Sequence, residues 1–290
     1  MDQNQPITPI RQFLLVISLL GFISPTIWAQ PLGLPWDSTL SEDQSIYLNV
    51  LPPAGFDRIA GEDPQLTEWM RHLPLKPADA PVRLYNGQLK SYQGAHAAVL
   101  DIDVGKRDLQ QCADAVMRLR AEYLFACGRF SEIQFHFTSG DLATYEAWRS
   151  GIRPVIQGNR VSWVKKAQYD DSYANFRKYL ITIFSYAGTH SLAKELEAVP
   201  SDVPVEVGDV WIQGGFPGHA VVVIDVVEHP ETGERRFLLA QSYMPAQDIH
   251  ILRNPNSTDD SPWYSMPETM LSTPEWTFDA TDRKRFGTIH

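Results

Sequence analysis

The chain has 290 residues, of which 43% are hydrophobic and 21% charged, and its formal net charge at pH 7 is −10. This composition is ordinary for a globular protein that is long enough to bury a sizeable core. Nucleic-acid-binding proteins normally carry a cluster of Lys and Arg, which this acidic sequence lacks. We therefore expect no nucleic acid as a partner, and binding to an anionic membrane surface is disfavoured for the same reason.

Residues 1–29 have the features of a secretory signal peptide. Arg11 precedes the apolar run Phe13–Ile23, and the small residue Ala29 ends the segment. The run is shorter than the roughly 20 apolar residues that a membrane-spanning helix needs, although an uncleaved anchor is the alternative. We predict export to the periplasm or the medium. The mature protein would begin near Gln30 and have no integral membrane segment.

The first part of the mature chain, residues 30–90, is expected to wrap the domain as an N-terminal arm. It is rich in Pro and turn residues, with one short helix expected at Pro64–His72. Alternating apolar and acidic side chains then predict a strand at Ala97–Val104. That strand would place Asp101 and Asp103 on the face opposite its apolar side chains.

The remainder of the chain predicts a helical part followed by a sheet. A strand is expected at Glu132–Thr138, and residues 141–200 are expected to be mainly helical. Residues 253–290 have the turn residues of a loose cover. A helical middle packed on a late antiparallel sheet predicts one α+β domain over residues 30–290. The helices expected in the middle are Asp171–Tyr186 and His190–Ala198, and the late strands are Val207–Ile212, His219–Val227, Arg236–Tyr243 and Asp248–Leu252.

A helix expected at Asp108–Phe125 carries the first candidate for a nucleophile, Cys112. Asp108 and Gln111 resemble a capping box, which would put Cys112 in or near the first turn. Backbone N–H groups and the helix dipole would lower the pKa of a thiol there. The alternative is a core cysteine, because Cys112 belongs to an apolar stripe at helical spacing. The stripe also contains Leu109, Val116, Leu119 and Tyr123.

The second cysteine, Cys127, lies at the other end of the same expected helix. Two cysteines in an exported protein often form a disulfide. Here about 15 helical residues would separate their Cα atoms by roughly 22 Å, whereas a disulfide needs about 7 Å or less. We therefore expect Cys112 to be a free thiol. No metal site or cofactor is expected, because the His residues follow no metal-binding spacing.

His219 is the candidate base. It opens a very apolar strand after a turn rich in Gly and Pro, which would place it at the mouth of a cleft facing the thiol. The alternative is a solvated histidine at a strand end. The following strand offers Gln241 and Ser242 as residues that orient the imidazole.

The register of the two strands decides between these orienting residues. With residues 230–233 as the hairpin loop, His219 would face Met244, and Ser242 would be its diagonal neighbour. Gln241 would reach the ring only if the hairpin contains a β-bulge. Asp225 shares the face of His219 but lies roughly 20 Å along the strand, so it is rejected.

These segments together resemble the papain-like cysteine hydrolases, especially the bacterial cell-wall branches called CHAP and NlpC/P60. The resemblance rests on Cys112 at a helix start, Gly208-Asp-Val and Gly-His219 at a strand, and a polar residue on the next strand. It implies a papain-like fold, Cys112 as nucleophile, His219 as base and Gln241 as third residue. It also implies cleavage of amide bonds, with a peptide or peptidoglycan-type substrate. Lys106 stands where these enzymes carry a Gln, which leaves the oxyanion hole unassigned.

Almost the whole mature chain also resembles an exported bacterial family, domain of unknown function 4846. The matching stretches are Asp108–Asp114, Pro217–Ala220 and Leu239–Gln247. This second resemblance implies no activity.

The sequence therefore predicts an exported cysteine amidase or peptidase. The alternative is a binding module on the same scaffold, in which Cys112 belongs to the core and the cleft holds a glycan or peptide without cutting it. Four further residues are candidates for lining the cleft, although ordinary sheet and loop surface is the favoured interpretation. They are Asp101, Asp103, Trp211 and Phe216.

Overall fold

Four strands from the second half of the chain form the centre of an antiparallel sheet. They are β8 (Val210–Gln213), β9 (His219–Glu228), β10 (Arg235–Gln241) and β11 (His250–Leu252). Each pairs with the next along the chain, as expected of short connections. The prediction of these strands is confirmed.

This computed structural model describes Met1, residues 33–34 and residues 42–287, so the expected signal peptide beyond Met1 lies outside the described residues.

Strands from earlier and later parts of the chain complete this sheet. β2 (His96–Val99) pairs with β11, whereas β15 (Arg283–Arg285) pairs with β8 and with β7 (Glu197–Ala198). The order is β2-β11-β10-β9-β8-β15-β7. β1 (Asp57–Arg58) adds to β9, and β12 (Tyr264–Ser265) adds to β10. The expectation of a loose C-terminal cover is therefore wrong, because β15 lies inside the sheet.

Strand β9 contains a bulge that changes which residues of the hairpin share a face. Leu238 pairs with Asp225, but the next residue, Leu239, pairs with Val223, so Ile224 is the extra residue. Beyond the bulge, Ala240 pairs with Val222. If this register continues to the start of β9, His219 lies opposite Tyr243 rather than Met244. Gln241 then becomes its diagonal neighbour on the same face.

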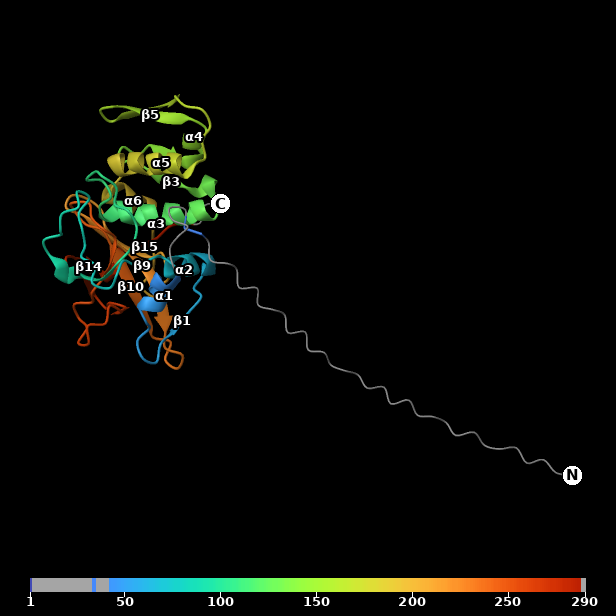
Figure 1. Cartoon of the computed structure of the whole chain (residues 1–290), viewed down its shortest axis with the longest axis vertical. Helices are drawn as coiled ribbons and strands as arrows, with labels where there is room; N and C mark the ends of the chain where they lie inside the picture. The colour runs from blue at the N-terminus through green and yellow to red at the C-terminus, as the bar shows by residue number, and fades with distance from the viewer. Residues whose placement is uncertain (2–32, 35–41, 288–290) are drawn as a thin grey trace. The chain divides into compact units, whose positions relative to one another are not determined.

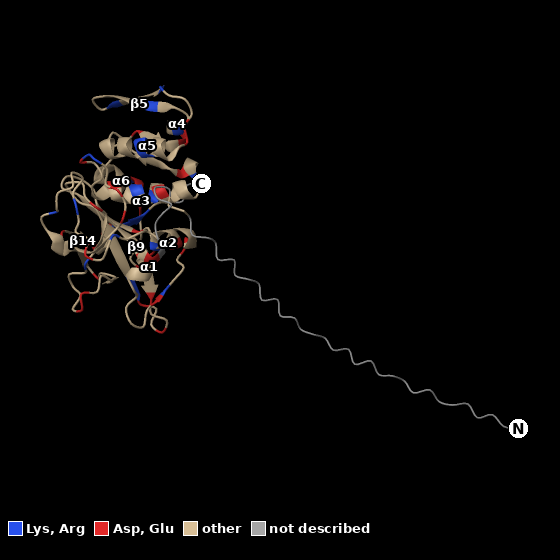
Figure 2. Cartoon of the chain, viewed as in Figure 1, with Lys and Arg blue, Asp and Glu red and all other residues tan. Residues whose placement is uncertain are grey.

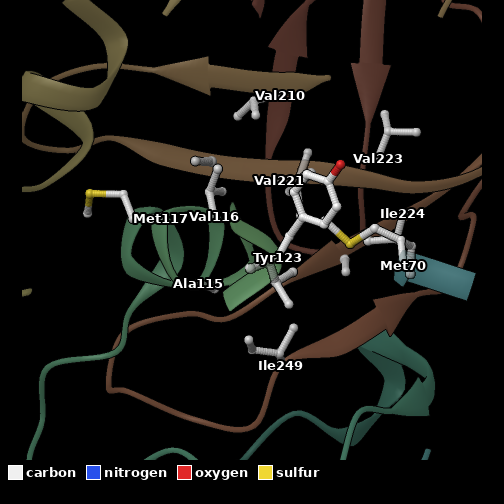
Figure 3. Close-up of a cluster of buried hydrophobic side chains, with 14 of the residues drawn as sticks. Met70, Ala115, Val116, Met117, Tyr123, Val210, Val221, Val223, Ile224 and Ile249 are labelled. Carbon is white, nitrogen blue, oxygen red and sulfur yellow. The ribbon is translucent and has the colours of Figure 1, made fainter. Parts of the chain in front are cut away.

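Two helices pack against this sheet through buried apolar side chains. α3 (Cys112–Ala126) lies across β9, and α2 (Pro64–Arg71) packs beside it. Figure 3 shows Val116 and Tyr123 of α3 next to Val221 of β9, with Met70 of α2 at the same cluster. The helix expected at Pro64–His72 is confirmed.

The region between residues 141 and 200 is less helical than expected. α5 (Tyr173–Tyr186) and α6 (Thr189–Glu195) are present, but a hairpin of β5 (Ile152–Gln157) and β6 (Arg160–Lys165) precedes them. Figure 1 shows α5 between α3 and this hairpin. A two-residue Gly158-Asn159 turn joins strands rich in β-branched residues, a hairpin signal that the helical interpretation overlooked.

Short elements connect these parts. β3 pairs with β4, and β13 pairs with β14 outside the main sheet. The strand expected at Glu132–Thr138 is confirmed as the shorter β3, whereas the strand expected at Ala97–Val104 stops at Val99. The bounds are α1 (Ile46–Asn49), β3 (Gln134–His136), β4 (Leu142–Thr144), α4 (Tyr145–Arg149), β13 (Met270–Ser272) and β14 (Thr277–Asp279), with 3-10 turns at Glu42–Gln44, Gln93–Ala95, Phe130–Glu132 and Ala280–Asp282.

A network of charges joins α3, α5 and the loop that leads to Cys112. Figure 2 shows Lys or Arg together with Asp or Glu on α3, beneath α5. Arg118 is fully buried and binds Asp103 at 2.9 Å and Glu122 at 3.3 Å, while Arg177 of α5 binds Asp103 at 3.1 Å. Because a buried charge is costly unless it is paired, this network fixes the loop before α3.

The architecture is thus mixed α/β, with a large antiparallel sheet and several helices. Within the described residues, no helix is both long enough and apolar enough to cross a bilayer.

Candidate functional site

A cavity of about 500 Å³ lies where the start of α3 meets the start of β9. Cys112 and His219, 107 residues apart in the sequence, both line it. Its other walls come from the α5–α6 connection, the turn before β9, the end of β10 and the segment before β14. They include Thr189, Phe216, Tyr243, Met244 and Trp276.

Cys112 is the first residue of α3, so the helix starts four residues later than the predicted Asp108. The Asp114 side chain caps it by accepting a hydrogen bond from the Gln111 backbone N–H at 3.0 Å. Asp108 instead accepts from the backbone N–H of Ala246 at 2.7 Å. Asp108 therefore ties the loop before Cys112 to the segment after β10, and the prediction that it caps the helix is wrong.

The thiol of Cys112 has a raised pKa rather than the lowered one that its helix position predicted. Burial raises the pKa to about 11, and the nearby Asp114 carboxyl adds to the rise. Hydrogen bonding from the backbone N–H groups of Ala113 and Ala220 opposes it. The contact with Ala220 places the sulfur against the residue that follows His219. Desolvation of the thiolate thus outweighs the helix dipole here.

His219 is buried, with 1% of its surface exposed, although a position at the strand mouth suggested a wetter site. Its ring packs against Tyr243, Trp276 and Phe278, with centroid separations of 4.8, 5.4 and 5.9 Å. Burial lowers the pKa of His219 to about 4; the hydrogen bond that the ring donates to Gln241 opposes this effect, and the positive charge of Lys90 adds to it. The imidazole is therefore neutral near pH 7.

Gln241 is the residue that reaches the ring. Its Oε1 lies 2.8 Å from Nε2 of His219, which the bulge in β9 makes possible. Ser242, the other candidate, lies 2.9 Å from the carbonyl oxygens of Gln110 and Gln247 and holds backbone instead. Asp225 binds Arg58 and Arg71 at 2.8 and 2.7 Å, in agreement with its rejection as an orienting residue.

Of the four further candidates for lining the cleft, Phe216 alone lines this cavity. It stands at the rim with 94% of its surface exposed. Trp211 is a core residue stacked on Phe237 at 5.1 Å, and Asp103 is held in the charge network of Arg118. Asp101 is half-buried in the loop after β2.

The contribution of the C-terminal segment to the site was not expected from the sequence. Trp276 and Phe278 pack on His219 from a stretch more than 50 residues downstream, where no strand was expected. The apolar residues around Thr277 were the available signal, but their place at the site depends on the pairing of β13 with β14 and on the hydrogen bond from Nε1 of Trp276 to Oε1 of Gln213 at 3.0 Å.

Both cysteines are free thiols, and they occupy opposite ends of α3. Among the described residues, no group of three or more His, Cys, Asp and Glu side chains is arranged to hold a metal ion.

Comparison with protein families assigns the chain to a family. A family model described as domain of unknown function 4846 matches residues 46–285. The chain belongs to this family. The matched range contains Cys112, His219 and Gln241. No curated protein and no solved structure matches the chain.

Proposed function

We propose that this member of the family is an exported, papain-like cysteine hydrolase that cleaves amide bonds in the peptides of the bacterial cell wall. One observation carries the proposal: Cys112 and His219 line one cavity, and Gln241 is hydrogen-bonded to the imidazole at 2.8 Å. A thiol, a base and a residue that orients the base are what acyl transfer by a Cys–His pair requires. A papain-like fold is supported by the order of the parts, with the Cys112 helix followed by antiparallel strands that carry His219 and Gln241.

The hydrogen bond to Gln241 selects the nitrogen of His219 that acts as base. An amide oxygen can only accept, so Nε2 of His219 carries the proton and Nδ1 carries the lone pair. Nδ1 takes the thiol proton as the sulfur attacks the substrate carbonyl carbon. The imidazolium then gives this proton to the leaving amine, and a thioester remains on Cys112. Water hydrolyses the thioester, which releases the acid and restores the thiol.

The resting pair is neutral under this proposal. The pKa of Cys112 is raised to about 11 and that of His219 is lowered to about 4, so the thiol is protonated and the imidazole uncharged between these values. Proton transfer therefore accompanies the attack on the substrate, and no thiolate–imidazolium pair forms beforehand. His219 acts as a general base in the strict sense.

The start of α3 supplies stabilisation for the oxyanion. As the first residue of the helix, Cys112 has a backbone N–H that no carbonyl of the same helix accepts. A carbonyl attacked by the Cys112 sulfur would develop its negative charge near this N–H and the positive end of the helix dipole. Lys106, in the exposed loop before α3, does not line the cavity.

The second candidate function is a binding module, and the raised pKa of the half-buried Cys112 favours it. A thiol with a raised pKa is what a core cysteine would have. In this case the cavity would hold a peptide or glycan without cutting it.

Muropeptides prepared from peptidoglycan test the two functions against each other. We expect the protein to cleave an amide bond in them, with new ends identified by mass spectrometry. Cys112→Ala should abolish cleavage, and Cys127→Ala, at the other end of α3, should cleave at the wild-type rate. An intact muropeptide pool that binds the wild type and Cys112→Ala equally well would overturn the hydrolase in favour of the binding module. If the muropeptides are neither cleaved nor bound by the protein, cell-wall peptides are excluded as the substrate of the hydrolase and as the ligand of the binding module.

A further inference from the structure

The Gln241 side chain is held by partners from distant parts of the chain. Its Nε2 lies 2.7 Å from Oε2 of Glu275, in the turn between β13 and β14, and 3.3 Å from Nε2 of His250 in β11. Nζ of Lys90 approaches the same Glu275 oxygen at 2.5 Å. Lys90, Gln241 and His250 are buried, and the Glu275 side chain is 12% exposed.

Each link in this network has one possible direction. A lysine ammonium can only donate and an ionised carboxylate can only accept, so Glu275, paired with Lys90, must receive the hydrogen bond from Gln241. The atom of Gln241 next to Glu275 is therefore the amide nitrogen. Its oxygen has to point at His219, and this requires the proton of His219 to be on Nε2.

His250 supports the same orientation from a second direction. Its Nδ1 lies 2.9 Å from the backbone carbonyl oxygen of Asp248, which can only accept. Nδ1 therefore carries the proton, and Nε2 is left to accept from the nitrogen of Gln241. Burial lowers the pKa of His250 to about 3, so this neutral form persists near pH 7.

We propose that Glu275, charged and anchored by Lys90, is a positioning residue that sets the tautomer of His219 by fixing the orientation of the Gln241 amide. This inference rests on the proposed function, because it concerns the base of that site. If the amide were reversed, its NH₂ group would face His219. Nε2 would then have to accept, and the proton would move to Nδ1. Nδ1 could then no longer take a proton from Cys112.

The location of the network supports a role beyond packing. Burying a Lys–Glu pair costs desolvation energy that well-packed apolar residues would avoid. This pair contacts Gln241, the side chain that is hydrogen-bonded to His219. The same C-terminal segment also supplies Trp276, whose ring packs on His219. Residues 275 and 276 thus act on the imidazole together, one through Gln241 and one directly.

The test uses ¹⁵N-histidine-labelled protein and long-range ¹H–¹⁵N NMR spectra near pH 7.5, which distinguish the two neutral tautomers of each imidazole. In the wild type we expect His219 to be protonated on Nε2 and His250 on Nδ1. In Glu275→Gln, whose amide can donate as well as accept, the His219 signal should shift toward the Nδ1-protonated form. Glu206→Gln breaks another ion pair, with Arg235 at 2.7 Å, and should leave the His219 tautomer unchanged.

Activity provides a second readout. If muropeptides are cleaved, kcat of Glu275→Gln should fall at least about tenfold, because a wrong tautomer removes the base, while KM stays the same. A folded Glu275→Gln whose His219 remains protonated on Nε2 would overturn the inference. If that variant does not fold, the wild-type spectrum still decides, because a proton on Nδ1 of His219 contradicts the proposed orientation. The spectra report on the tautomer even if the protein cleaves nothing, so this failure is distinct from that of the hydrolase.

Discussion

The two ends of α3 each carry a free cysteine, and the difference between them lies in what the sheet brings to each end. Cys112 lines a cavity together with His219 and lies against the backbone N–H of Ala220. Cys127 caps the other end, with its sulfur 3.7 Å from Oε1 of Gln65. Burial is the largest cause of a raised pKa at both thiols. Position along a helix therefore does not by itself activate a thiol. The neighbouring imidazole distinguishes Cys112.

Removing the imidazole of His219 should leave Cys112 without a base, as Cys127 already is under this proposal. We expect His219→Asn to lower kcat for muropeptide cleavage by about 10²- to 10⁴-fold, because the general base is lost. Since His219 is packed between three aromatic rings, a small side chain would also leave a cavity, so Asn is preferred to Ala.

His190→Asn is the matched control, because His190 also lines the cavity. It should retain activity, and thermal unfolding of both variants should show that each is folded. Equal loss of activity in the two variants would remove the special role of His219.

The two thiols should differ in their rates of alkylation, and Cys112 should be the slower one, whereas the helix dipole alone would make it the faster one. The pKa of Cys112 is raised to about 11, above the free-thiol value of about 8.5. Its thiolate fraction therefore grows only as the pH approaches about 11. Iodoacetamide should label Cys127 before Cys112 near pH 7, and labelling of Cys112 should keep rising beyond pH 9. Peptide mass spectrometry over time measures both rates. Fast labelling of Cys112 near pH 6.5 would show an activated thiolate and contradict the neutral resting pair.

The same raised pKa affects stability at high pH. The unfolded chain ionises Cys112 near pH 8.5 and the folded protein does so only near pH 11. The contribution of Cys112 to the free energy of unfolding is thus fully present below about pH 8.5 and is lost as the pH rises from there to about 11. Chemical unfolding of Cys112→Ser between pH 8 and 10.5 should show a smaller loss than unfolding of the wild type. A loss as steep as that of the wild type would mean that another group is responsible.

Asp114 affects only one of the two thiols, because its carboxyl raises the pKa of Cys112. Asp114→Asn keeps an oxygen that can accept from the Gln111 N–H but removes the negative charge. We expect the pH midpoint of Cys112 alkylation to fall, while labelling of Cys127 is unchanged. A midpoint that moves upward would show that the cap outweighs the charge.

The smallest effect is expected at the rim of the cavity. Phe216 is 94% exposed, so Phe216→Ala should leave the unfolding temperature unchanged. Its apolar surface can contact substrate, and its loss should raise KM by about two- to tenfold, with little change in kcat. Leu51→Ala is the control, because Leu51 is also exposed and does not line the cavity. An unchanged KM would exclude Phe216 from substrate binding.

Sequence periodicity was sufficient to predict the part of the site that lies on the neighbouring strands β9 and β10. The apolar run after His219 fixed β9, and the hairpin loop fixed the register closely enough to show that Gln241 needs a bulge. The bulge at Ile224 is present. The α3 helix was also predicted, but it was expected to begin at Asp108, four residues before its actual start at Cys112, and its cap is Asp114 rather than Asp108.

The remaining features depend on contacts between segments that are distant in the sequence. The pKa of Cys112 follows from burial under other elements, which helix position does not reveal. Glu275 and Lys90 are 185 residues apart, and local pattern does not indicate that they meet behind Gln241. The β5–β6 hairpin was missed for a different reason, because its Gly158-Asn159 turn was outweighed by the helical surroundings.

Under the proposed function, Cys112 and not Cys127 is the nucleophile of the His219 site. The direct measurement uses an alanyl p-nitrophenyl ester as acyl donor, acid quenching within seconds, and peptide mass spectrometry to locate the acyl group. We predict a thioester on Cys112 in the wild type, little in His219→Asn and none on Cys127. Acylation of Cys127 at the same rate, or no acyl group on Cys112, would contradict the account.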